Sequence, residues 1–232
     1  MIDGTREWDE QKWYARTLLE CSLAIKCPSI DLHLSTFKKF QQVFTDETIL
    51  RKASGSEETT ETIKHLFKGI WSLEDLCKEG APVNEVVEDA IQHPHNYVLK
   101  PQKEGGGNNF FDGELQQKLQ IAKAANGRDP ELSTYLIMKR INPPMIPAVL
   151  LRCGQARQQT TMSEFGFFSI VISRNTDKGR QTLHNRVIGS LMRTKDSHNN
   201  EGGVNAGYAV IDRPLVVPSE VFNQAVEGVL RF

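Results

Sequence analysis

The sequence lacks any long apolar stretch. None of its 232 residues belongs to a run that approaches the roughly 18 apolar residues of a membrane span, and Met1–Glu7 lacks the apolar core of a secretory signal. Net charge is nearly absent as well, because 28 Lys and Arg residues oppose 29 Asp and Glu residues. This balance excludes a broad basic surface for nucleic acid and an acidic disordered chain. We therefore expect no membrane and no nucleic-acid partner.

Cysteine is also scarce. The four cysteines form no CxxC pair and have no histidine or cysteine neighbours at zinc-site spacing: Cys21, Cys27, Cys77 and Cys153. His93-Pro94-His95 is a close histidine pair, but its proline breaks helical spacing and indicates a loop. Reduced thiols in a cytoplasmic protein are the simplest interpretation, and disulfides remain an alternative.

Apolar residues in the first part recur at helical spacing. This periodicity predicts helices over residues 14–25, 30–44, 63–71 and 86–91, with Pro28 stopping the first of them. The strongest apolar stripe belongs to the segment 63–71, which we expect to form an amphipathic helix.

The rest of the chain alternates β-prone runs with turn signals. Strands are expected over 97–99, 134–138, 148–151, 167–172 and 182–188, and helices over 115–122 and 219–230. Helices followed by an antiparallel sheet with further helices indicate the α+β class.

A glycine triplet after the strand 97–99 is the most informative motif. Consecutive glycines let backbone N–H groups approach an anion, and Lys100 and Lys103 add positive charge. Glu104 fits beside a phosphate when Mg²⁺ lies between them, since Mg²⁺ takes oxygen ligands from both. The segment is neither a P-loop nor GxGxxG. By composition alone, a flexible surface loop with solvated charges is favoured.

Two further segments favour a ligand site. Arg193-Thr194-Lys195 follows an expected strand, and a second glycine-rich loop comes soon after it at residues 201–207. Arginine holds a carboxylate by two parallel bonds, and lysine places a point charge on phosphate. Ser163-Glu164 is expected between two strands, where the carboxylate would bond ribose hydroxyls. The alternatives are a solvated surface hairpin and a strand-end charge.

Several of these segments resemble eukaryotic glutathione synthetase in order and spacing. They are Ile25–Pro28, Lys38–Gln42, Lys100–Asn109, Ser163–Gly166 and Leu191–Lys195 with Gly202-Gly203-Val204. The resemblance covers almost the whole chain, and it implies a truncated member or a C-terminal portion of that family.

The resemblance implies an ATP-grasp fold within residues 1–232, with a mainly helical segment over 1–75 and the ATP-grasp sheet with its glycine-rich loops over 95–232. It implies an ATP-dependent ligase that joins γ-glutamylcysteine to glycine through an acyl phosphate. ATP and Mg²⁺ are the expected cofactors, small molecules the expected partners, and a homodimer a further expectation.

The resemblance also implies roles for individual residues. Arg193 and Lys195 would be catalytic, with Arg193, Val204 and Asn205 on the substrate side. Glu104 would bind the metal. The ATP contacts would be Lys38, Lys100, Gly105, Gly106, Gly107, Asn108, Asn109, Met138, Lys139, Arg140, Ile141, Glu164, Lys195 and Glu201.

Three positions depart from the family pattern. Lys139 replaces a glutamate in the adenine segment, Phe111 replaces a tyrosine, and Asn205 replaces a small residue. They leave two alternatives open. One is a catalytically degenerate nucleotide-binding or interaction protein, and the other is a ligase with a different amino acid acceptor.

Overall fold

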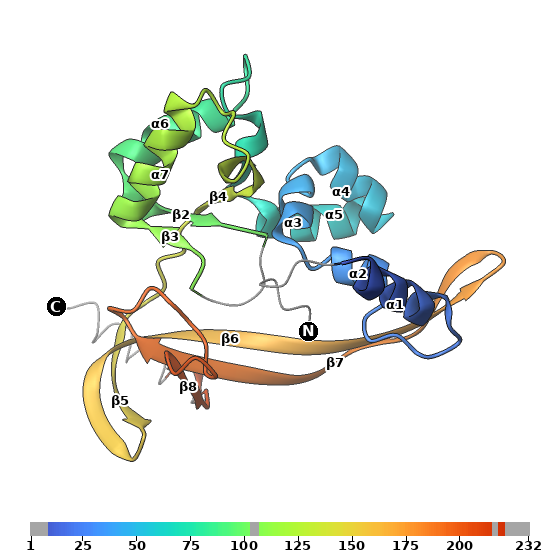
Figure 1. Ribbon diagram of the computed structural model, residues 1–232. Coiled ribbons are helices and arrows are strands. Elements are labelled where there is room, and N and C mark those ends of the chain that lie inside the picture. Colours follow the sequence, from blue (N-terminus) through green and yellow to red (C-terminus); the bar gives the residue numbers. More distant parts are fainter. Residues whose placement is uncertain (1–8, 103–106, 215–217, 221–232) are drawn as a thin grey trace. The chain divides into compact units, whose positions relative to one another are not determined.

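The computed structural model describes residues 9–102, 107–214 and 218–220 (Figure 1). The chain divides into two units, Met1–Ile141 and Asn142–Phe232. The helices are α1 (Glu10–Cys21), α2 (Ile30–Leu34), α3 (Lys38–Val43), α4 (Glu47–Ser54), α5 (Glu57–Ile63), α6 (Val83–Gln92) and α7 (Asp112–Ala124). The strands are β1 (Ile70–Ser72), β2 (Tyr97–Lys100), β3 (Phe110–Phe111), β4 (Leu136–Lys139), β5 (Ile146–Arg152), β6 (Gln155–Thr176), β7 (Gly179–Asp196) and β8 (Ala209–Asp212).

The first unit is built on an antiparallel sheet with the strand order β1-β4-β2-β3. The central strand β4 pairs with β1 through Met138 and Ile70, and with β2 through Ile137 and Leu99. Helices α6 and α7 supply the other half of the core, where Leu99, Leu115, Leu119 and Ile137 have an exposed fraction of 0%. Burial of these apolar side chains is the main stabilisation of this unit.

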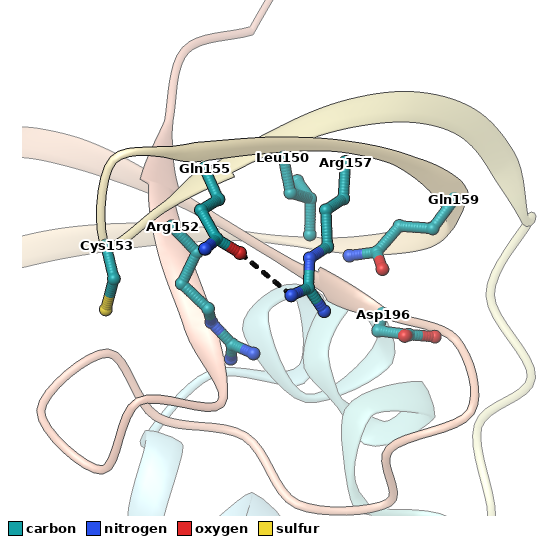
Figure 2. Close-up of a pocket in the computed structure, with 7 residues that line it drawn as sticks. All are labelled: Leu150, Arg152, Cys153, Gln155, Arg157, Gln159 and Asp196. Atoms are coloured by element: carbon teal, nitrogen blue, oxygen red, sulfur yellow. Dashed lines mark hydrogen bonds between the residues drawn. The ribbon is translucent and has the colours of Figure 1, made fainter.

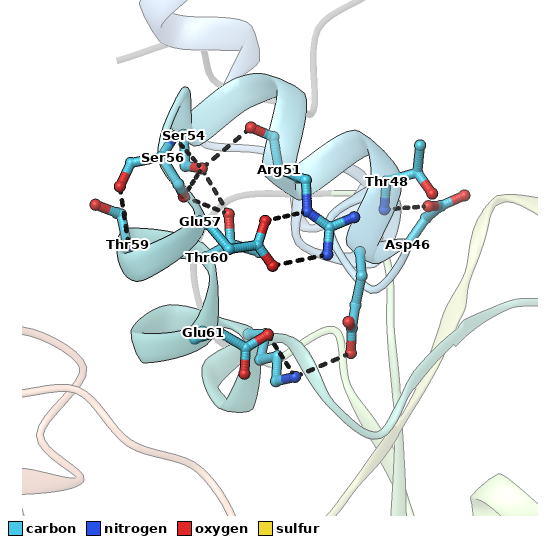
Figure 3. A network of polar contacts seen from close by, with 11 residues as sticks. Asp46, Thr48, Arg51, Ser54, Ser56, Glu57, Thr59, Thr60 and Glu61 are labelled. Atoms are coloured by element: carbon cyan, nitrogen blue, oxygen red, sulfur yellow. Dashed lines mark hydrogen bonds and ion pairs between the residues drawn. The ribbon is translucent and has the colours of Figure 1, made fainter.

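Helices α4 and α5 are joined by a tight polar network (Figure 3). Gly55 takes a left-handed conformation (φ 66°) after α4, and the Ser56 hydroxyl accepts from the Thr59 N–H to cap α5. The fully buried Thr60 hydroxyl lies 2.7 Å from the Ser54 hydroxyl and donates to the Ser56 carbonyl oxygen at 2.8 Å. These local bonds fix a helical hairpin without a large apolar core.

The second unit is an antiparallel meander in the order β5-β6-β7-β8. Its dominant feature is the long β6–β7 hairpin, whose two strands have 22 and 18 residues. Glu164 lies opposite Arg193, and Thr161 lies opposite Asp196. Because side chains alternate between the two faces of a strand, odd-numbered β6 residues up to Phe167 share one face and even-numbered residues share the other.

The middle of this hairpin, residues 165–172 of β6, is apolar on both faces. Phe165 and Phe167 stack edge to face on one side, with ring centroids 4.9 Å apart. Phe168 and Ile170 lie on the other side and are 54% and 40% exposed. Continuous apolar strands are typical of sheets that are covered on both faces. Within the described part of the second unit, no element covers either face.

The helix expected over residues 63–71 is wrong. Helix α5 ends at Ile63, a 3₁₀ turn covers Lys64–Phe67, and Ile70–Ser72 is strand β1. Gly69 takes a left-handed conformation (φ 72°) that a helix cannot contain, and its carbonyl oxygen accepts from the Lys139 N–H at 2.8 Å. Pairing with β4 therefore outweighs the helical spacing of the apolar residues.

Other boundaries also differ from the expectation. The first helix ends at Cys21, well before Pro28, and the expected helix 30–44 is two short helices separated by Ser35–Phe37. Ser163-Glu164 and Arg193–Lys195 lie inside β6 and β7, where the sequence suggested strand ends. Most of the expected helix 219–230 lies outside the described residues.

The other expected helices and strands are present. Residues 86–91 and 115–122 lie in α6 and α7, and residues 97–99 lie in β2. The runs 148–151, 167–172 and 182–188 lie in β5, β6 and β7. The expected run 134–138 overlaps β4 from Leu136 onward. The α+β fold class is confirmed.

Gly127 gives a direct test of the packing after α7. Its φ is +68°, and an added Cβ would lie 2.4 Å from the Leu76 carbonyl oxygen, whereas Gly80 has φ +70° and open space. We expect Gly80→Ala to cost about 1 kcal/mol from backbone conformation alone. Gly127→Ala should cost about 1–3 kcal/mol more, because the backbone around Leu76 must shift. Chemical denaturation of both variants checks this, and equal losses would contradict it.

Candidate nucleotide-binding site

The start of α3 is fastened to the sheet of the first unit by Gln102. The Gln102 Oε1 accepts from the Lys39 N–H at 3.1 Å, and its amide donates to the Thr134 carbonyl oxygen at 3.5 Å. The Lys39 ammonium bonds the Ser72 hydroxyl at 3.1 Å and Glu74 at 3.0 Å. Lys39 is therefore an anchor. Its neighbour Lys38 begins the same helix, and Lys100 ends β2 two residues before Gln102.

The expected adenine segment, Met138–Ile141, lies at the end of the central strand. The N–H groups of Lys139 and Arg140 donate to the carbonyl oxygens of Gly69 and Asn96, each at 2.8 Å. Among the described residues, the Ile141 N–H has no backbone acceptor, and its side chain is 86% exposed. The backbone of Ile141 is thus the part of this segment that remains available to a planar hydrogen-bonding ligand.

The side chains of this segment are partly committed elsewhere. The Arg140 guanidinium lies 5.5 Å from the centroid of the Phe111 ring and 3.6 Å from the Asp112 carboxylate. Phe111, where the family pattern has tyrosine, therefore supports Arg140 through its ring face. The stem of Lys139 lies against Gly69, where an added Cβ would come within 3.1 Å of the Lys139 Cβ.

A carboxylate on α6 holds strand β2 in place. The Tyr97 hydroxyl donates to Asp89 Oδ2 at 2.5 Å, and His93 Nδ1 lies 2.9 Å from the other oxygen of Asp89. Burial, and then the Asp89 carboxylate, raise the pKa of Tyr97 to about 12. The hydrogen bond from Tyr97 lowers the pKa of Asp89. Tyr97 therefore stays a hydrogen-bond donor at neutral pH and fixes the strand that leads to Lys100.

The glycine-rich loop is described only in part. Gly107 (φ 83°), Asn108 and Asn109 lead into β3, while Glu104, Gly105 and Gly106 lie outside the described residues. Elsewhere in the described chain, no three His, Cys, Asp or Glu residues gather at metal-binding distance. The metal expectation on Glu104 therefore stays a prediction. A carboxylate and the nearby asparagine amides are oxygen donors of the kind that Mg²⁺ takes.

In the second unit, Glu164, Arg193 and Lys195 share one face of β6–β7. Arg193 and Glu164 are directly opposed, and an Arg193 nitrogen lies 2.6 Å from Glu164 Oε1. Both side chains are partly exposed, so the ion pair is worth only about 0–1 kcal/mol, and a ligand can displace it at little cost. Lys195 donates to the carbonyl oxygens of Asn200 and Glu201, each at 3.0 Å.

The expected substrate residues lie in a tight turn before β8. The Gly207 N–H donates to the Val204 carbonyl oxygen at 3.0 Å, and the N–H groups of Tyr208 and Ala209 donate to the Gly203 carbonyl oxygen. Val204 is half-buried and Asn205 is exposed. The loop that begins at Glu201 thus has a defined hydrogen-bonded core.

Sequence reasoning missed Thr194, which links β6, β7 and β8 on the face opposite Arg193 and Lys195. Thr194 lies between Arg193 and Lys195 on the opposite face and is 1% exposed. Its hydroxyl donates to Asp212 Oδ2 at 2.7 Å and lies 2.8 Å from the Ser163 hydroxyl. Three strands are linked at this point. The small threonine between two long basic residues was the available signal, but it indicates an inward-facing side chain only once residues 193–195 are known to lie inside a strand.

Comparison with known proteins agrees with this architecture. The family model described as "Eukaryotic glutathione synthase, ATP binding domain" matches residues 3–216. The chain belongs to this family. It is 39% identical to glutathione synthetase of Xenopus laevis over 214 residues, covering 91% of this chain and 43% of that protein. It is 37% identical to a chloroplastic glutathione synthetase of Solanum lycopersicum, covering 90% of this chain and 36% of that protein.

The family member described here spans well under half the length of those relatives. A solved structure of a glutathione synthetase-like effector from Globodera pallida shares the fold, with a TM-score of 0.53 and 22% identity. The alignment covers 88% of this chain and 39% of that chain. In the described part of the chain, no helix is long and apolar enough to cross a membrane.

Thr194 provides a test of how the Arg193–Lys195 segment is held. Thr194→Val keeps the shape of the side chain but leaves Asp212 and Ser163 without this partner. We expect a loss of about 1–3 kcal/mol in unfolding free energy. The matched control is the exposed Thr182 of the same strand, where Thr182→Val should change stability by about 0.5 kcal/mol or less. Urea denaturation measures both, and equal effects would contradict the role of Thr194.

Proposed function

We propose that this chain is the ATP-binding part of a glutathione synthetase and contributes to joining γ-glutamylcysteine and glycine. The observation that carries the proposal is the family match over residues 3–216. The arrangement of the first unit supports it, since β2, which ends at Lys100, and β4, which ends at Lys139, are neighbouring antiparallel strands, and Gln102 attaches α3 to their sheet. The ATP-grasp sheet over residues 95–232 is part of the same proposal.

In the first unit, Lys38 and Lys100 would contact the phosphates, and Gly105–Asn109 would cover them. The backbone of Met138–Ile141 would contact adenine, with Ile141 as the hydrogen-bond donor. Glu104 would bind Mg²⁺, whose charge would help to neutralise the phosphates when it is bound. Because the proposed donor is the Ile141 backbone, the absence of a glutamate side chain at Lys139 would not prevent this adenine contact.

In the second unit, Glu164 would bond the ribose hydroxyls, and Lys195 and Glu201 would contact ATP. Arg193 would hold a substrate carboxylate after leaving Glu164, while Val204 and Asn205 would contact the tripeptide. The weakness of the exposed Glu164–Arg193 ion pair supports such an exchange of partners.

The proposed chemistry has two steps. The cysteinyl carboxylate oxygen attacks the γ-phosphorus of ATP, and ADP leaves with the electrons of the broken P–O bond. The glycine amine then attacks the acyl phosphate carbon, an amide bond forms, and phosphate leaves. Negative charge develops on the transferred phosphoryl group, so the lysines are needed in place beforehand.

A second candidate function is an interaction module that binds nucleotide without turnover. The observation that favours it is the β6–β7 hairpin, whose apolar residues are exposed on both faces. The partner would be the part of a glutathione synthetase polypeptide that this chain does not match. Asn205 also keeps open a ligase with an acceptor other than glycine.

Nucleotide binding is tested by a thermal shift with Mg-ATP. Ligand at a hundredfold excess over its Kd adds about 2.7 kcal/mol to the stability of the folded chain. We expect Lys100→Gln to remove most of the shift. Lys52→Gln, on the exposed face of α4, makes the same change in charge and should retain it. Absence of any shift for the unmodified chain would contradict nucleotide binding.

Release of ADP in the presence of γ-glutamylcysteine and glycine separates the two functions. Turnover by the chain alone supports the ligase. A thermal shift without ADP release supports the interaction module. ADP release only after the unmatched part of the Xenopus laevis protein is added would support a ligase completed by a second polypeptide. Release that depends on another amino acid would identify a different acceptor.

A further inference from the structure

A cavity of about 250 Å³ lies on the β5–β6 hairpin of the second unit (Figure 2). It is lined by Leu150, Arg152, Cys153, Gln155, Arg157, Gln159 and Asp196. The two-residue turn Cys153-Gly154 has positive φ at both positions, 50° and 76°, as tight hairpin turns require. The turn therefore fixes the register of the strands beside the cavity.

The strand register brings two arginines to this cavity from different strands. Arg152 lies opposite Gln155, and Leu150 lies opposite Arg157. Arg152 and Arg157 are thus diagonal neighbours on one face, within reach of each other's long side chains. Figure 2 shows both guanidinium groups extending to the same side of the hairpin. The buried Leu150, 7% exposed, forms the apolar floor between them.

Each of the two guanidinium groups donates a hydrogen bond to a neutral acceptor. Arg157 donates to Gln155 Oε1 at 2.8 Å, and Arg152 donates to the Gly207 carbonyl oxygen. In the described chain, no carboxylate lies within ion-pair distance of either arginine. Asp196, also at the cavity, accepts instead from the His198 N–H at 2.9 Å. Two positive charges and one negative charge therefore line the same small space.

This cavity lies on the face of the sheet opposite the proposed nucleotide residues. Gln155, Arg157 and Gln159 are odd-numbered β6 residues, whereas Glu164 is even-numbered, and no register shift occurs between them. Asp196 pairs with Thr161, while Lys195 pairs with Met162 on the other face. The cavity is therefore separate from the Glu164–Arg193–Lys195 face.

We propose that this cavity binds a small molecule with two carboxylates and one ammonium group, such as L-glutamate or a γ-glutamyl peptide. Each guanidinium would take one carboxylate by parallel hydrogen bonds, and Asp196 would take the ammonium group. The bond between Arg152 and Gly207 connects the cavity to the turn that contains Val204 and Asn205. Occupancy of the cavity therefore alters the conformation of that turn.

The test is NMR titration of the ¹⁵N-labelled chain with L-glutamate and, separately, with glutathione. We expect saturable shifts for residues near the cavity and for Gly203 and Gly207. Arg157→Gln should weaken binding about tenfold or more, because a charge-assisted hydrogen bond is lost. Arg174→Gln is the matched control, since Arg174 also lies in β6 and donates to a glutamine, Gln181, at 2.9 Å. It should bind like the unmodified chain.

Comparison ligands decide the chemistry. Inorganic phosphate has no carboxylate and glycine has only one, so both should bind more weakly than L-glutamate. Binding of phosphate as tight as that of L-glutamate would overturn the proposal in favour of a phosphate site. An equal loss of L-glutamate affinity in Arg157→Gln and Arg174→Gln would also overturn it, because binding would then not depend on the cavity. No saturable shift with either titrant would also overturn it. The Mg-ATP thermal shift should be unchanged in Arg157→Gln, so failure here is distinguishable from failure of the nucleotide site.

Discussion

Consecutive side chains of an extended strand point to opposite faces, and this alternation decides what β6 and β7 can do. A shift of one residue in their pairing would exchange every side chain between the faces. With the observed register, Glu164, Arg193 and Lys195 share one face. Thr194, bonded to Ser163 and Asp212, occupies the other face and links three strands. One hairpin thus carries the charged side chains of Glu164, Arg193 and Lys195 on one side and the hydrogen bonds of Thr194 on the other.

In the first unit, the corresponding constraint is the pairing of β4 between β1 and β2. Backbone bonds from Lys139 to Gly69 and from Arg140 to Asn96 fix the segment up to Arg140. Ile141 is the point where this pairing stops. The same sheet carries Lys100 at the end of β2, and Gln102 attaches the start of α3. Local pairing therefore accounts for the positions of the side chains that the nucleotide proposal uses.

Much of this fold could be predicted from local patterns. The spacing of Leu115, Leu119 and Ala122 identified α7, and Tyr97–Leu99 identified β2. Ile70 and Trp71 were misassigned to a helix because their pairing partners, Met138 and Ile137, lie far along the chain. The long strands were seen only as short runs, since their polar halves carry no apolar signal. Motif resemblance singled out Arg193 and Lys195, and strand alternation places them on one face with Thr194 on the other. Only the register shows that Glu164 shares the face of Arg193 and Lys195. The expected division at residues 75 and 95 stays a prediction.

The register of β6 with β7 is the central claim, and backbone nuclear Overhauser effects measure it directly. The observed register predicts Hα–Hα or HN–HN effects between Glu164 and Arg193 and between Met162 and Lys195, with Thr161 opposite Asp196. Hα–Hα or HN–HN effects that pair Glu164 directly with Met192 or with Thr194 would contradict it, because Glu164 would then leave the face that carries Arg193 and Lys195.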